Sequence, residues 1–594
     1  MCRIAGAISP TLHKDELSAF VNSMCFVQKH GGPDDSGTYS GETFNGVIGH
    51  CRLSIIDITP AGHQPMNYLS QKYVISYNGE IYNYKELRDE LKNSGYSFST
   101  QSDTEVIMAA YDKWGTAAFE RFNGMFAFAL CDTQKNEMIL VRDVSGIKPL
   151  YYAHTQNCFA FASEVRALKQ LPQLQEENKN WPVYLMAYGH LPEPVTTLKD
   201  VAPLPKGHYL KYNIADNTIS TASFERLKYF EKIGNHKEAV DLIRHTLDAA
   251  VKRHLISDAP IGVFLSGGLD SSIIAMLAGK HQQQLNTVSI YFDNENYSEK
   301  KYQDELLKNL PCSHQQFLLS ENDFHTSLPS IISAMDLPCC DGINTWFISK
   351  YAKESGLKAV LSGIGGDELF GGYPSFKRIN TALLLAHLPD KILKAGRFAQ
   401  SKKLRRLCYL SINGPVGKYL FLRGQFIPSD IAKFLNADEA EIWNILEQQP
   451  LLPDISFLTP ANQASWLETN MYMQNQLLRD ADTMSMAHGL EIRVPYLDKE
   501  FARLAFKIQS NVKYKGALGK QLLIDSFKDI VPRLIWDRPK MGFSFPFKEW
   551  LSNSSYSTAT NGEDLKMYHT KLINNQMHWS QFFTLLLMRS YGNE

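Results

Sequence analysis

The chain has 594 residues, 44% of them hydrophobic and 21% charged, and because single cores rarely exceed roughly 250–300 residues we expect at least two domains. Its 61 basic and 62 acidic residues nearly cancel, so net charge gives no reason to expect nucleic acid or an anionic membrane as a partner. Nine cysteines without C-x-x-C spacing argue against metal fingers and disulfide scaffolds, and the absence of a run of roughly 18 apolar residues argues against a membrane span.

The first part of the chain is predicted to be rich in strands. Up to about residue 165, short apolar runs alternate with Gly, Asn and Asp turns, and helical periodicity is confined to Tyr84–Asn93 and Asp103–Trp114. Lys206–Leu210 is the last predicted strand. The polar, weakly patterned residues 211–235 are expected to form a linker, which makes 1–210 the first domain.

The second predicted domain, 236–594, begins with a change to long helical patterns. His236–His254 is a predicted helix, and it leads into the apolar strand Ile261–Leu265, a glycine turn and an apolar helix at Ser272–Ala278. Strand, glycine turn and helix in this order open a parallel α/β unit. Further core strands are predicted at Val288–Phe292 and Lys358–Leu361.

The glycine turn is the strongest motif in the chain. It consists of Ser266, Gly267, Gly268, Leu269, Asp270, Ser271 and Ser272. Glycines let the backbone approach an anion, and the following helix start supplies free N–H groups. A turn without a ligand is the competing interpretation, but the full motif between strand and helix favours binding of a pyrophosphate group. It is similar to the loop of ATP enzymes that release pyrophosphate.

A second glycine cluster follows the predicted strand at Lys358–Leu361. It runs from Ser362 and Gly363 through Ile364 to Asp367 and Glu368. Asp270 and Asp367 together are candidate ligands for Mg²⁺, which prefers one or two carboxylates besides substrate oxygens. Lys520 is a candidate for stabilising phosphate charge in a transition state, although a lysine on a helix is most often solvated.

The N-terminus offers a nucleophile. Removal of Met1 would leave Cys2 with a free α-amino group of pKa about 7.7–8.0, which can act as the base for its own thiol. A lone cysteine is weak evidence, because free cysteines are mostly packing residues.

Further motifs supply what binding and hydrolysis of glutamine would need. Arg52 can pair with an α-carboxylate and Asp103 with an α-ammonium group. Asn78 and the N–H of Gly79 can form an oxyanion hole, although Asn-Gly is also a strong hairpin-turn signal. The remaining predicted glutamine-binding residues are Leu53, Ser54, Ile55, Ile56 and Glu80.

With these motifs in order from Cys2 to about Trp550, the chain resembles the glutamine-hydrolysing asparagine synthetases. Met484–His488, Leu490–Asp498 and Arg538–Phe543 also belong to the resemblance. It implies an N-terminal-nucleophile α-β-β-α sandwich followed by a doubly wound parallel α/β domain, with an ammonia tunnel between their sites. It further implies ATP as a substrate and ATP contacts from Leu265, Ile290, Ser362 and Gly363.

Two positions depart from the family pattern. The family commonly has His-Arg-Gly-Pro-Asp, but here Gly31 replaces the arginine, so any contact of that arginine must come from elsewhere. Well-studied members have glutamate where this chain has Ile364, and that acid is linked to activation of aspartate and handling of ammonia. The resemblance therefore supports the reaction type better than the identity of the acceptor.

Three hypotheses follow. The first is an asparagine synthetase, the second is the same chemistry on another carboxylate such as a sugar uronic acid or a peptide carboxylate, and the third is a regulatory homologue without synthesis. The intact loop at 266–272 and Cys2 argue against the third. Small-molecule substrates, no nucleic acid or membrane partner, and a cytoplasmic location are expected, since residues 1–20 do not resemble a signal peptide. The sequence leaves open whether the protein forms a homodimer.

Overall fold

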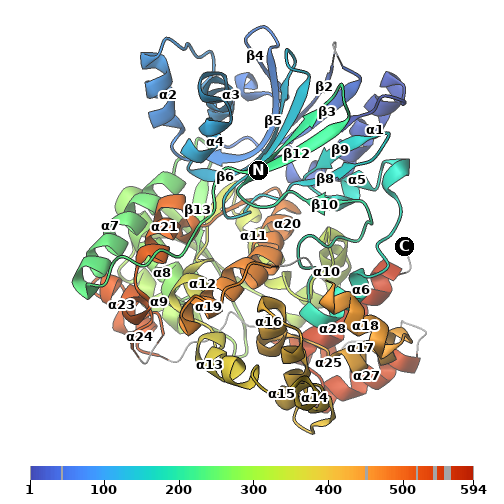
Figure 1. Cartoon of the computed structure of the whole chain (residues 1–594). Helices are drawn as coiled ribbons and strands as arrows, with labels where there is room; N and C mark the ends of the chain where they lie inside the picture. The colour runs from blue at the N-terminus through green and yellow to red at the C-terminus, as the bar shows by residue number, and fades with distance from the viewer. Residues whose placement is uncertain are drawn as a thin grey trace.

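The structure is a computed structural model that describes residues 2–41, 44–448, 452–516, 519–538, 545–553 and 563–592. Its first domain contains two stacked antiparallel sheets (Figure 1). The first sheet has the order β10 (Ala202–Pro203), β8 (Tyr151–His154), β9 (Phe159–Ala162), β1 (Arg3–Ile8), β3 (Gly46–Arg52) and β2 (Asp35–Ser40). The second has the order β12 (Thr218–Ser223), β11 (His208–Asn213), β7 (Glu137–Arg142), β6 (Gly124–Asp132), β5 (Tyr73–Ile81) and β4 (Met66–Tyr68).

The alternation of side chains along β1 explains the layers. Ile4 and Ile8 enter the core between the two sheets, whereas Ala5 and Ala7 face outward. Helices α1 (Lys14–Val27) and α5 (Val165–Leu168) cover the outer face of the first sheet, and α2 (Tyr84–Asn93) and α3 (Asp103–Trp114) cover that of the second. The predicted α-β-β-α sandwich is therefore confirmed.

The predicted linker began too early. β12 pairs along its whole length with β11, from Thr218 opposite Asn213 to Ser223 opposite His208. Its burial is low because it forms the edge of the sheet, and so its sequence looks like a polar connection. The connection proper follows β12 and runs along the second domain, where Phe230 N–H donates to Phe506 O at 3.0 Å.

The second domain is built on a parallel sheet. Its spatial order is β15 (Cys312–Leu318), β14 (Leu285–Tyr291), β13 (Ile261–Phe264), β16 (Ala359–Leu361) and β17 (Glu491–Arg493). The chain moves outward from β13 in one direction and then returns to the other side of β13, so the order reverses between β13 and β16. Ligands bind at such a point in doubly wound sheets, and both predicted glycine loops follow these two strands.

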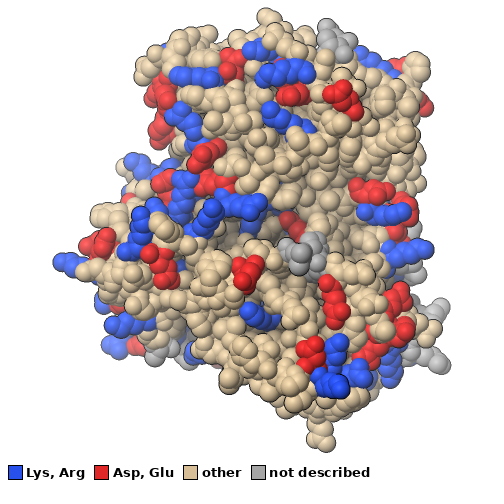
Figure 2. All heavy atoms as spheres, in the orientation of Figure 1, with Lys and Arg blue, Asp and Glu red and all other residues tan. Residues whose placement is uncertain are grey.

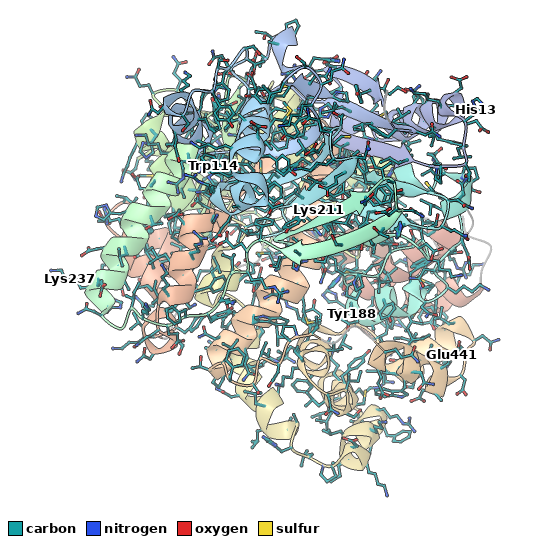
Figure 3. All side chains as sticks on the ribbon, turned by 45° about the horizontal axis from the view of Figure 1, so that its top comes forward. His13, Trp114, Tyr188, Lys211, Lys237 and Glu441 are labelled. Atoms are coloured by element: carbon teal, nitrogen blue, oxygen red, sulfur yellow. The ribbon has the colours of Figure 1, made fainter. Side chains whose placement is uncertain are left out.

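The domains are closely packed against each other. Helix α6 (Trp181–Tyr188) belongs to the first half of the chain but lies among helices of the second domain, as Tyr188 does in Figure 3. Tyr184 Oη donates to Ile445 O at 2.9 Å, and Gln425 N–H donates to Ala187 O at 2.9 Å. One hydrophobic cluster runs from the outer face of the first sheet through the second domain. The domains therefore share a core.

The surface agrees with the balanced composition. On the face shown in Figure 2, basic and acidic side chains are interspersed over both domains. Within the described residues, no helix is long and apolar enough to cross a bilayer.

Candidate active sites

Cys2 lies at the end of the sandwich, immediately before β1. Its backbone N–H donates to Asn78 Oδ1 at 3.2 Å, and its Sγ lies 3.9 Å from Leu53 O. Burial raises the pKa of the Cys2 thiol to about 11. A thiol with this pKa is protonated at neutral pH, so it needs a base beside it to act as a nucleophile.

Asn78 and Gly79 lie in the middle of β5, opposite Ala127 and Phe126 of β6. The interpretation of Asn-Gly as a hairpin turn was therefore wrong. Gly79 has φ +150°, and a Cβ there would collide with Met125 O, so the strand needs glycine at this point. Among the described residues the Asn78 Nδ2 group has no hydrogen-bond partner. It is a donor available close to Cys2.

Arg52, whose charge acts on the Cys2 thiol, and Asp103, which contacts β5, are both held by several hydrogen bonds. The Arg52 guanidinium donates to Thr59 O at 3.0 Å and also to Asp57 O. Asp103, in the first turn of α3, accepts from Tyr77 Oη at 2.8 Å and Ile81 N–H at 2.9 Å. Burial raises the pKa of Asp103. One end of the sandwich thus combines a thiol, a guanidinium, an amide and a carboxylate.

The other predicted glutamine-binding residues are buried around this end. They are Leu53, Ser54, Ile55 and Ile56, which follow β3, and Glu80, which follows Gly79. The Glu80 carboxylate is directed at the second domain, 3.3 Å from the Arg493 guanidinium on β17. Its side chain is therefore part of the domain interface.

The second site is a cavity of about 680 Å³ at the reversal point of the parallel sheet. The first glycine loop joins β13 to α8 (Leu269–His281), and Gly267 adopts φ +77°, where glycine is favoured. Inside the loop, Gly268 N–H donates to Ser266 Oγ at 3.2 Å, and the Ser266 and Ser271 hydroxyls are 2.9 Å apart. The loop is thus a compact turn that opens α8, as an anion site requires.

The second glycine loop packs directly onto Asp270. A Cβ on Gly363 would lie 2.9 Å from Asp270 Cβ, and one on Gly366 would lie 2.6 Å from Asp270 Cγ. The glycines therefore permit the close approach. Lys520 Nζ then contacts the carboxylates of both Asp270 and Asp367. Although burial lowers the pKa of Lys520, the two carboxylates raise it above its ordinary value, so the side chain stays charged.

These two carboxylates are also candidates for holding a magnesium ion. Asp270 and Asp367 approach the same Lys520 nitrogen, so both lie within reach of a single ion. Among the described residues there is no group of three or more His, Cys, Asp or Glu placed to hold a metal. A site with two carboxylates and substrate oxygens fits Mg²⁺ better than a metal that requires an all-protein cage.

Most predicted ATP-binding residues line the cavity, together with Ile364, Asp367 and Lys520. Those that line it are Leu265, Ser266, Gly268, Asp270, Ser271, Ile290, Ser362 and Gly363. Gly267 and Ser272 do not line it; Gly267 lies against Tyr302, and Ser272 is completely buried in the first turn of α8.

Several lining residues were not predicted. They are Asp341, Asn344, Thr345, Tyr472 and Asp480, while Arg538 was noted only within a motif whose residues 539–543 lie outside the described part of the chain. Asp480 lies in the first turn of α20 (Arg479–Met486), which continues η7 (Glu468–Leu478), a segment with π-helical hydrogen bonding. Such segments are frequent at functional sites, and here the run of buried polar residues was the only signal.

Two of the acids on the cavity wall have strongly altered pKa values. Burial, helped by the Asp367 charge, raises the pKa of Glu368 to about 7. Burial also raises the pKa of Asp480 to about 7. Glu368 accepts from Gly365 N–H at 3.0 Å and Tyr373 Oη at 2.7 Å, which explains its role as a support for the second loop.

Comparison with known proteins places both halves in described families. The asparagine synthase family matches residues 242–569, and the glutamine amidotransferase domain matches residues 1–225. Asparagine synthetase [glutamine-hydrolyzing] 1 of Bacillus subtilis is 31% identical over 93% of this chain and 88% of its own length. A putative asparagine synthetase of Mycobacterium bovis is 33% identical over 92% and 87%. Asparagine synthetase B of Escherichia coli K12 is 30% identical over 89% and 91%.

Proposed function

Since the chain belongs to the asparagine synthase family and carries a glutamine amidotransferase domain in front, we propose that this carbon–nitrogen ligase is a glutamine-dependent asparagine synthetase. It would convert aspartate, ATP, glutamine and water into asparagine, AMP, pyrophosphate and glutamate. The observation that carries the proposal is the convergence of both glycine loops on Lys520 in one cavity.

In the amidotransferase domain, Cys2 would be the nucleophile. After loss of Met1 its nitrogen becomes an amine, held at Asn78 Oδ1, that can take the thiol proton. The sulfur attacks the amide carbon of glutamine, and the oxyanion is stabilised by Asn78 Nδ2 and the Gly79 N–H. Ammonia leaves with a proton, and water then hydrolyses the thioester to glutamate. Arg52 and Asp103 would hold the α-carboxylate and α-ammonium groups.

In the second domain, a carboxylate oxygen of the acceptor would attack the α-phosphorus of ATP. Pyrophosphate leaves, held by the N–H and hydroxyl groups of the loop at 266–272, and Lys520 stabilises the negative charge that develops. Ammonia then attacks the acyl-adenylate carbonyl, AMP leaves, and loss of a proton completes the amide. Asp270 and Asp367 would hold Mg²⁺, which when bound neutralises phosphate charge.

The acceptor is tested by pyrophosphate release with ATP, Mg²⁺ and ammonium. We expect release to be stimulated many-fold by aspartate, with asparagine formed in equal amount. Negligible stimulation by aspartate would reject the proposal. Glucuronate and a peptide with a free carboxylate belong in the same screen, because Ile364 places an apolar side chain on the cavity wall. Stimulation by one of them alone would assign the same chemistry to another acceptor.

A further inference from the structure

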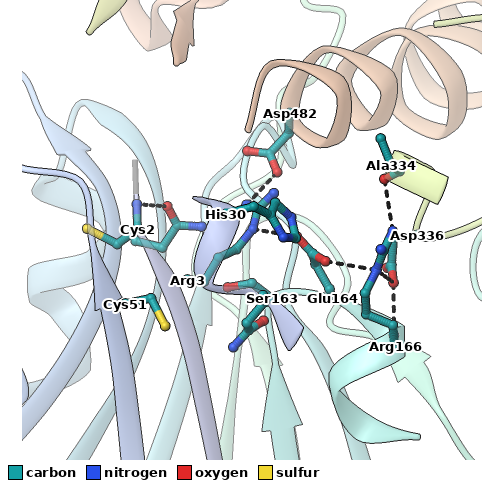
Figure 4. A network of polar contacts seen from close by, with 12 residues as sticks. Cys2, Arg3, His30, Cys51, Ser163, Glu164, Arg166, Ala334, Asp336 and Asp482 are labelled. Carbon is teal, nitrogen blue, oxygen red and sulfur yellow. Dashed lines mark hydrogen bonds and ion pairs between the residues drawn. The ribbon is translucent and has the colours of Figure 1, made fainter. Parts of the chain in front are cut away.

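Arg3 follows the nucleophile directly, yet no step described above uses its guanidinium. The Cys2 backbone N–H donates to Asn78 inside the sandwich, whereas the Arg3 side chain is directed toward the second domain and contacts Asp482 there. Arg3 is completely buried. Its Nε donates to Glu164 Oε1 at 2.7 Å, and its Nη1 donates to Asp482 Oδ2 at 2.7 Å (Figure 4).

The two acids fix Arg3 from both domains. Glu164 follows β9 in the amidotransferase domain, and its Oε1 is also 3.0 Å from His30 Nε2. Asp482 lies on α20 of the second domain and is 3.6 Å from Lys148 Nζ. A buried arginine with two acids is a rigid connection, since removal of either side leaves an uncompensated buried charge.

Gly31 provides the space for this arginine. A Cβ on Gly31 would lie 2.8 Å from both Cγ and Nε of Arg3. The family pattern has an arginine at position 31, and such a side chain could not coexist with Arg3 in this arrangement. In this chain the Arg3 guanidinium, on β1, therefore lies beside position 31, where the family has the arginine.

Helix α20 links this contact to the second site. Asp480 lines the cavity, whereas Asp482, two residues later, contacts Arg3. Residues two apart on a helix face different sides. One side of α20 therefore borders the synthetase cavity, and the other contacts Arg3, the first residue of β1 and the neighbour of Cys2.

We propose that Arg3 is a positioning residue for Cys2, fixed to α20 through Asp482 in the space left by Gly31. This inference depends on the proposed glutamine hydrolysis. It predicts that a substitution in the second domain, at Asp482, impairs glutamine hydrolysis in the first domain. The same substitution should leave ammonia-dependent chemistry nearly unchanged.

Arg3→Met and Asp482→Asn in the full chain test the proposal. In both variants we expect kcat for glutamate release to fall roughly 10- to 100-fold, the scale of a misplaced catalytic group, with the KM for glutamine changed by less than about threefold. Ammonium-dependent pyrophosphate release should stay within about twofold of wild type, because it does not need Cys2.

Arg503→Met is the matched control, because Arg503 Nε also donates to an acid of the first half, Glu225 Oε1 at 2.8 Å, but contacts neither site. It should leave both activities unchanged. Wild-type glutamate release in Arg3→Met and Asp482→Asn, or equal loss of both activities, would overturn the inference. A wild-type protein that hydrolyses no glutamine would instead reject the proposed function.

Gly31→Ala gives a second, independent measurement. In the Arg3 background the added methyl group should displace the guanidinium and reduce glutamate release. In an Arg3→Ala background it should have almost no further effect, because its collision partner is absent. If Gly31→Ala reduced glutamate release by the same factor in both backgrounds, the effect would not come from a collision with Arg3.

Discussion

At the scale of single residues, Lys520 shows how a weak sequence signal becomes a strong structural one. In the sequence it is a single lysine of a kind that is most often solvated. In the structure it is 8% exposed, lies in the left-handed region at φ 52° and contacts two carboxylates that come from two loops. A non-glycine residue in this conformation must be held by its surroundings, and such residues cluster at functional sites.

Lys520→Met should therefore lower pyrophosphate release by roughly 10²–10³-fold, the scale of losing one stabilising group for transition-state charge. Glutamine hydrolysis should survive, because Cys2 and its neighbours are untouched. The measurement is release of pyrophosphate and of glutamate by the same preparation. Lys528→Met is the control. Lys520 directly precedes the short helix α23 (Gln521–Phe527) and Lys528 directly follows it, but the Lys528 side chain is exposed. Unchanged pyrophosphate release in Lys520→Met would exclude the proposed role.

The site residues that could be predicted are those within compact motifs. Cys2, Asn78 and the loop at 266–272 have recognisable neighbours, so their types and spacing indicated chemistry. Asp341 and Asp480 could not be predicted, because they reach the cavity only through packing of helices that are far apart in the sequence. Arg3 has no sequence signal of its own, and only the structure gives it partners.

At the scale of elements, strands were predictable where they are buried and apolar. β13, β14 and β16 correspond to apolar runs that the sequence marks clearly. β15 alternates between exposed and partly buried positions at the sheet edge, and β17 has three residues with charges at both ends, so neither has a strong local signal.

Between the two sheets of the first domain, His50 on β3 and Ser76 on β5 form a buried hydrogen bond of 3.0 Å.

This histidine predicts how the sandwich responds to acid. Burial, reinforced by the Arg52 charge, lowers the pKa of His50 to about 3. Between pH 6.5 and 3 the unfolded chain therefore binds a proton that the folded chain does not, and stability falls as the pH falls through this window. His50→Gln should remove this contribution, which amounts to roughly 3 kcal/mol between pH 7 and pH 4.

Urea unfolding of wild type and His50→Gln at both pH values measures the difference. His63→Gln serves as the control, because its imidazole is half-exposed and pairs with Asp35 at the surface. If wild type and His50→Gln lose the same free energy of unfolding on acidification, the buried imidazole does not contribute as described.

At the scale of the whole molecule, the two sites lie on either side of a shared interface. Glu80 meets Arg493 and Arg3 meets Asp482 across it. Two domains were expected because each half has its own periodicity and motifs, whereas the two architectures were implied by the family resemblance. The interface was not predicted, because its ion pairs join residues several hundred positions apart without any local pattern.

In the proposed mechanism Cys2 supplies ammonia to a second site, which can also use free ammonium. The most direct test of this mechanism compares wild type and Cys2→Ala with ATP, Mg²⁺ and aspartate, using either glutamine or ammonium as the nitrogen source. We predict that Cys2→Ala forms no asparagine from glutamine, while its asparagine and pyrophosphate formation from ammonium equal those of wild type. Glutamine-driven synthesis by Cys2→Ala, or loss of the ammonium-driven reaction, would contradict the account.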